Sequence, residues 1–114
     1  MNRISHYSFG HIIVDGISYR SDVIIYPDRV DPSWWRQEGH RLSREDLSGV
    51  LATRPKIVII GTGALGVMNV PVELTAALST EGMTVFVERT ARAVELYNQV
   101  DDRRRVVAAL HLTC

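Results

Sequence analysis

The chain has 114 residues, and its 13 lysine and arginine residues balance its 13 aspartate and glutamate residues. This length suits one domain of ordinary size, so we expect a single domain over residues 1–114. A hydrophobic fraction of 46% and a charged fraction of 23% are typical of a globular protein and exclude intrinsic disorder. Neither half of the chain carries an excess of positive charge, which argues against nucleic-acid binding. Because charge repulsion between neutral chains is weak, the protein could also form an oligomer.

The only cysteine, Cys114, excludes an internal disulfide and a zinc site built from cysteines. This composition suits a reducing compartment, and residues 1–6 lack the apolar core of a secretory signal. Apolar runs such as residues 57–60 fall far short of the ~20 residues that span a bilayer. We therefore expect a cytoplasmic protein without a membrane span.

The first half of the chain opens with two β-rich runs, residues 9–14 and residues 17–26. Asp15 and Gly16 separate them, and Asp-Gly between apolar runs predicts a hairpin because a type I′ turn requires positive φ at both central residues. Residues 20–22 interrupt the second run and indicate a bulge or bend within one strand.

An irregular loop is predicted over residues 27–42, and from there helical and strand patterns alternate. The predicted strands cover residues 56–60, 83–87 and 106–112. Three helices are predicted to begin at Ser43, Pro71 and Thr90, with Ser43 and Thr90 as N-caps. The order is ββαβαβαβ, and strands that alternate with single helices imply parallel crossover units. We expect an α/β fold with a mixed sheet, parallel in its centre, and helices packed on it.

Residues 61–66 (GTGALG) match the pattern GxGxxG directly after a predicted buried strand, and Glu88 ends the next strand. In dinucleotide-binding proteins the backbone N–H groups of such a loop approach a pyrophosphate at a helix N-terminus. Here the helix is predicted to begin only at Pro71, so a phosphate bound at the glycines would lie too far from the helix N-terminus to be stabilised by it. The sequence favours a tight turn over a nicotinamide or flavin nucleotide site, and we expect no cofactor.

A small cleft is nevertheless expected at the carboxyl ends of the parallel strands, where open α/β sheets bind ligands. Gly61, Thr62 and Gly63 leave one strand, and Arg89 and Thr90 follow the next. Two threonine hydroxyls and an arginine would suit a small polar or anionic ligand. The competing interpretation is that Thr90 caps a helix and that Arg89 is a solvated charge.

Other polar and aromatic residues have two interpretations each. Asp22 is either a buried acid near this cleft or a bulge residue, and Trp34 and Trp35 either cover the core edge or bind a partner. Residues 103–105 form a basic run that directly follows two aspartates and is predicted to be solvated. The four histidines lack metal-ligand spacing, so no metal site is expected, and His111 is interpreted as a satisfied core histidine.

Several short motifs, taken in order, resemble one family. They are residues 7–10 (YSFG), 14–16 (VDG), 21–25 (SDVII), 34–36 (WWR), 39–40 (GH), 59–63 (IIGTG), 90–93 (TARA), 97–98 (YN) and 105–114 (RVVAALHLTC). On these motifs the chain resembles the Mth-domain family, a domain of unknown function. Its eukaryotic relatives include a mitochondrial assembly factor for respiratory complex I and an adipogenesis-associated protein.

The resemblance implies a compact three-layer α/β domain with a mixed, mainly parallel sheet, an N-terminal antiparallel hairpin and flanking helices. It implies no established activity and no established cofactor. It places a pocket near Asp22, the Gly61-Thr62-Gly63 turn, Thr90 and Asn98.

The function expected from the residues and the resemblance is a small, non-enzymatic protein-interaction or assembly module with a small cleft. Trp34 and Trp35 are the predicted partner-binding residues. The alternative is a small-ligand or nucleotide binder, or an enzyme, that uses the Gly61-Thr62-Gly63 loop. No catalytic motif decides whether the protein is an enzyme.

Overall fold

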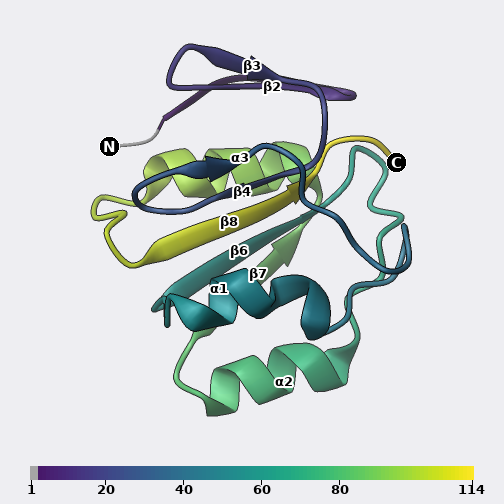
Figure 1. Ribbon diagram of the computed structural model, residues 1–114, viewed down its shortest axis with the longest axis vertical. Coiled ribbons are helices and arrows are strands. Elements are labelled where there is room, and N and C mark those ends of the chain that lie inside the picture. Colours follow the sequence, from purple (N-terminus) through teal and green to yellow (C-terminus); the bar gives the residue numbers. More distant parts are fainter. Residues whose placement is uncertain (1–2) are drawn as a thin grey trace.

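The computed structural model describes residues 3–114, and Figure 1 shows the arrangement of its elements. The strands are β1 (Ile4–Ser8), β2 (His11–Val14), β3 (Ile17–Tyr19), β4 (Val23–Ile25), β5 (Val30–Asp31), β6 (Ile57–Thr62), β7 (Thr84–Glu88) and β8 (Val106–His111). The helices are a 3₁₀ turn, η1 (Glu45–Leu47), and three α-helices, α1 (Ser48–Ala52), α2 (Val72–Thr80) and α3 (Thr90–Gln99).

The main sheet has five strands in the order β5-β4-β8-β6-β7. Its centre is parallel, because β6 pairs in parallel with both β7 and β8, whereas β4 pairs antiparallel with β8 and β5. The central strands β6 and β8 are continuous apolar runs because helices or a second sheet cover both of their faces. The predicted mixed sheet with a parallel centre is confirmed.

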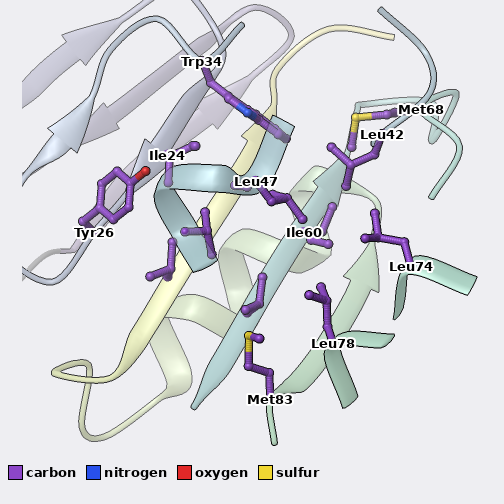
Figure 2. Close-up of a cluster of buried hydrophobic side chains, with 14 residues drawn as sticks. Ile24, Tyr26, Trp34, Leu42, Leu47, Ile60, Met68, Leu74, Leu78 and Met83 are labelled. Atoms are coloured by element: carbon purple, nitrogen blue, oxygen red, sulfur yellow. The ribbon is translucent and has the colours of Figure 1, made fainter. Parts of the chain in front are cut away.

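The fold has three layers, as Figure 1 shows, with α1 and α2 on one face of the main sheet and α3 on the other. Alternate residues of β6 enter opposite cores, since side chains alternate across a strand. Ile60 belongs to the core under α1 and α2, where Leu78 and Met83 pack (Figure 2). Ile59 belongs to the core that Tyr97 of α3 and Ile12 of β2 share.

The predicted Asp-Gly hairpin is confirmed between β2 and β3, with φ of 51° at Asp15 and 80° at Gly16. However, the prediction of one strand over residues 17–26 is wrong. Its first part, β3, belongs to a separate three-stranded antiparallel sheet, β1-β2-β3, and its second part, β4, belongs to the main sheet. Residues 20–22 are therefore the crossing between two sheets, and Asp22 is not a bulge residue.

Two predicted N-caps are also wrong. The first helical turn begins at Glu45, and Ser43 instead donates its backbone N–H to the Asp46 carboxylate at 2.9 Å. Thr90 is the first residue of α3, with Arg89 at the N-cap position, and its hydroxyl bonds outside the helix. The helix expected after Pro71 is confirmed as α2, and β1 and β5 were not predicted.

Candidate functional site

The carboxylate of Asp22, directly before β4, joins three parts of the chain. Its Oδ1 accepts a hydrogen bond from the Leu112 N–H at 2.7 Å, and its Oδ2 lies 2.8 Å from both Arg36 Nη1 and His111 Nδ1. The side chains of Arg36 and His111 are each only 6% exposed. Burial alone would raise the pKa of Asp22, but hydrogen bonds from His111, the Leu112 amide and Arg36 outweigh it and lower the pKa. Asp22 therefore stays ionised and holds the loop over residues 27–42 against β4 and the end of β8.

His111 is buried as predicted, but only one of its ring nitrogens is satisfied. His111 Nδ1 lies 2.8 Å from Asp22 Oδ2, which can only accept, and 3.1 Å from Arg36 Nη2, which can only donate, so the tautomer decides which of the two contacts is a hydrogen bond. Among residues 3–114, the buried Nε2 of His111 and the buried Nε of Arg36 have no hydrogen-bond partner. The sequence analysis did not single out Arg36 as a site residue. Its ion pair with Asp22 joins a loop to the residue before β4, and such a pair leaves no periodic pattern in the sequence.

The Thr90 hydroxyl holds the carboxyl ends of β6 and β8 against the start of α3. It donates to the His111 backbone oxygen at 2.6 Å and accepts from the Gly63 N–H at 2.9 Å. Thr90 is fully buried. A Cβ at Gly61 would lie 2.7 Å from this hydroxyl, so this glycine permits the close approach of α3 to β6.

The glycine loop does not fit a dinucleotide. Five of its backbone N–H groups donate hydrogen bonds within the protein. Gly63 donates to the Thr90 hydroxyl, and Ala64, Gly66, Val67 and Met68 donate to the backbone oxygens of Thr113, Gly63, Cys114 and Thr62, respectively. Gly63 has φ of 107°, and a Cβ there would collide with the backbone of Cys114. The following helix, α2, begins only at Val72. The glycines therefore serve backbone packing, and these five amides are occupied and do not point at a pyrophosphate.

The remaining residues predicted for the cleft lie in different places. The Thr62 hydroxyl donates to the Glu88 backbone oxygen at 3.1 Å. Arg89 is exposed, and its side chain runs past Gly66. Asn98 bonds both backbone polar groups of Ile4, near the far end of α3 and roughly 12 Å along the helix from Thr90. The structure thus brings the glycine turn and Thr90 together, while Asp22 and Asn98 have other partners.

The two adjacent tryptophans have opposite environments. Trp34 is 6% exposed, and its Nε1 donates to the Asp46 backbone oxygen at 2.9 Å. The guanidinium of Arg36 stacks 4.8 Å from the centre of the Trp34 ring. Trp35, between these two buried side chains, is 74% exposed. Trp34 therefore covers the core, and Trp35 is presented to solvent.

Trp35 borders a hollow of about 410 Å³ between the loop and the start of α1. Its described lining includes three acids, Asp31, Glu45 and Asp46, and no lysine or arginine. The two carboxylate oxygens of Asp46 accept backbone N–H groups of Gln37 and Ser43. Asp31 Oδ1 accepts the Ser33 N–H at 3.0 Å, whereas Glu45 is exposed. The hollow is acidic, and the Glu45 carboxylate is its most accessible charge.

Residues 3–114 hold neither a metal-binding cluster nor a helix that could span a membrane. No three histidine, cysteine, aspartate or glutamate side chains within this range come together as a metal site would require. No helix in the same range has the length and apolar character needed to cross a membrane.

Comparison with known families decides what kind of protein this is. The sequence model of a protein family of unknown function (DUF498/DUF598) matches residues 4–111. The chain belongs to this family. No curated protein matches it.

Solved structures agree with this membership. The protein MT938 is 26% identical, with a TM-score of 0.79 and all of both chains covered. A Rhodopseudomonas palustris protein is 31% identical, with a TM-score of 0.76, covering 95% of this chain and 81% of the other. A Mth938-like domain of Bordetella pertussis is 20% identical, with a TM-score of 0.64, covering 97% and 85%. The resemblance to the Mth-domain family and its α/β fold is confirmed.

Replacing Thr90 tests the junction in this DUF498/DUF598 protein. Thr90→Val leaves the Gly63 N–H and the His111 carbonyl buried without a partner, so the free energy of unfolding should fall by about 3 kcal/mol in urea titrations. Thr80→Val, on the exposed side of α2, should change it by less than about 0.5 kcal/mol. Equal losses in the two variants would contradict this role for Thr90.

Replacing Asp22 tests the buried carboxylate. Asp22→Asn should lower the free energy of unfolding at pH 7 by about 3 kcal/mol, because it removes one partner of a buried ion pair. The pKa of Asp22 is lower in the folded than in the unfolded state, so its contribution is present above about pH 4 and is lost as the pH falls through the folded value. Urea titrations from pH 7 to pH 3 should show the difference between wild type and variant narrowing below about pH 4. A difference that stays constant down to pH 3 would exclude the ionised carboxylate as its source.

Proposed function

We propose that this protein is a non-enzymatic interaction module that binds a basic segment of a partner protein through Trp35. The observation that carries the proposal is the 74% exposure of Trp35 between two buried side chains. Tryptophan is largely buried in most folded proteins, and it is enriched among the residues that dominate protein interfaces. An exposed indole in this setting supports a role in partner binding.

The fixed neighbours of Trp35 add to this argument. Trp34 is held by its hydrogen bond to Asp46, and Arg36 is held by Asp22 and by the Gly39 backbone oxygen at 3.0 Å. These contacts hold the backbone on both sides of Trp35. A loop whose backbone is ordered before binding loses less conformational entropy when a partner binds.

The charges around Trp35 favour a basic partner. Asp31 and Glu45 line the same hollow as the indole. A lysine or arginine side chain of a partner would find an aromatic face and two carboxylates within one site. Complementary charge also steers the encounter and disfavours acidic partners.

The wider proposal keeps three expectations from the sequence. These are a single domain over residues 1–114, a role as an assembly or interaction module, and a cytoplasmic location in keeping with one cysteine. A small polar or anionic ligand at the Gly61-Thr62-Gly63 turn stays a prediction. Its backbone amides are already bonded, so we rank it second.

Affinity capture from a lysate of the source organism, followed by titration of the purified partner, tests the proposal. Trp35→Ala should weaken the partner's affinity by about 30-fold or more, as expected for an interface tryptophan. Phe9→Ala removes an aromatic side chain that is 62% exposed at another site, and it should leave the affinity unchanged. Glu45→Gln should weaken binding less than Trp35→Ala, and mainly at low salt.

Trp34→Ala is not a usable variant here, because it opens the core and removes a buried hydrogen bond. Partners that bind Trp35→Ala as tightly as wild type would overturn the proposal. If cross-linking located the interface on an acidic segment of the partner, the proposal that the bound segment is basic would be overturned.

A further inference from the structure

Figure 1 shows the end of the main sheet at which β6, β7 and β8 begin. Residues just before these three strands line a second hollow, of about 460 Å³. The residues that line it are Leu51, Arg54, Pro55, Lys56, Glu81, Gly82, Met83 and Arg105. Three of these are cations, which come from two connections far apart in the sequence. The basic run predicted at residues 103–105 contributes only its last residue to this site.

The acid that lines this hollow already has a partner: both carboxylate oxygens of Glu81 accept hydrogen bonds from Arg44, at 2.9 and 3.0 Å. Within residues 3–114, Arg54, Lys56 and Arg105 take part in no ion pair. Three cations therefore share one hollow in a chain whose net charge is zero, and the carboxylate that acts on Lys56, Asp102, does so beyond ion-pair distance.

The backbone conformation of Arg54 is a second, independent indication that its side chain has a binding role. Arg54 follows the C-cap of α1 and has φ of 49°, the left-handed conformation in which helices usually place glycine. An L side chain is less stable there than glycine. The Arg105 guanidinium donates to the Arg54 backbone oxygen at 2.6 Å, which holds the Arg105 side chain against the backbone of Arg54. Strained positions of this kind cluster at binding sites.

We propose that this basic hollow binds the phosphoryl group of a small anionic molecule. Guanidinium groups match the oxygens of a phosphoryl group with paired N–H donors, and the Lys56 ammonium adds a third positive charge. Leu51, Pro55 and Met83 line the same space and would contact a less polar remainder of the molecule. The site is separate from the Trp35 hollow and does not depend on the proposed partner.

The competing explanation is purely structural. Helices α1 and α2 both end near this hollow, and cations stabilise helix C-termini. The two explanations predict opposite effects of Arg54→Gly on stability. If the side chain only supports α1, its removal lowers the melting temperature. If the arginine is present for a ligand, glycine relieves the left-handed strain and raises it.

Calorimetric titration with pyrophosphate at low salt, combined with thermal unfolding, tests the proposal. Wild type should bind one pyrophosphate in a saturable manner. Arg54→Gly should weaken binding at least tenfold while raising the melting temperature by about 4 °C. Lys56→Gln should weaken binding without a large change in melting temperature. Arg20→Gln removes one exposed positive charge elsewhere and should bind like wild type.

Three results would overturn the proposal. The first is the absence of saturable binding to wild type. The second is equal weakening by Arg20→Gln and Lys56→Gln, which would indicate a response to net charge alone. The third is a lower melting temperature for Arg54→Gly together with unchanged binding, which would assign the arginine a structural role.

Discussion

The carboxylate of Asp22 is the constraint on which the proposed surface depends. An ionised carboxylate that is largely buried must be paired, and here the Leu112 amide, His111 and Arg36 pair it. Arg36 is thereby held inside the protein, where its guanidinium covers the Trp34 ring. With both neighbours held inside the protein, Trp35 lies on the surface, 74% exposed. One buried charge thus links the crossing between the two sheets to the exposure of the residue proposed to bind a partner.

The order and type of most elements could be predicted because they leave strong local signals. The continuous apolar run of β6, the Asp15-Gly16 turn and the proline that precedes α2 each have a physical cause within a few residues. The split of residues 17–26 between two sheets could not be predicted, because it depends on Asp22 finding partners about 90 residues away. The helix caps were wrong for a related reason: the Thr90 hydroxyl serves a tertiary contact rather than its own helix.

The candidate site could be predicted only in part. The sequence singled out Trp34 and Trp35 as a pair, but nothing local distinguishes the buried one from the exposed one. The GxGxxG pattern is real, yet its glycines permit close backbone packing against Thr90 and Cys114. The two charged hollows have no sequence signature, because Asp31 and Glu45, like Arg54 and Arg105, meet only in the folded chain. A chain with no net charge therefore carries an acidic and a basic hollow at separate places.

Hydrogen–deuterium exchange of the complex with its captured partner tests the central claim most directly, because it shows whether the Trp35 surface or the glycine turn is protected on binding. If Trp35 and the acidic hollow bind the partner, binding should slow amide exchange in residues 31–37 and 45–49, the two segments that supply most of the lining of that hollow. Residues 61–67, which include the bonded amides of Gly63, Ala64, Gly66 and Val67, should exchange as in the free chain. Protection confined to residues 61–67 and 88–91, with residues 31–37 unchanged, would contradict the account and would place binding at the glycine turn.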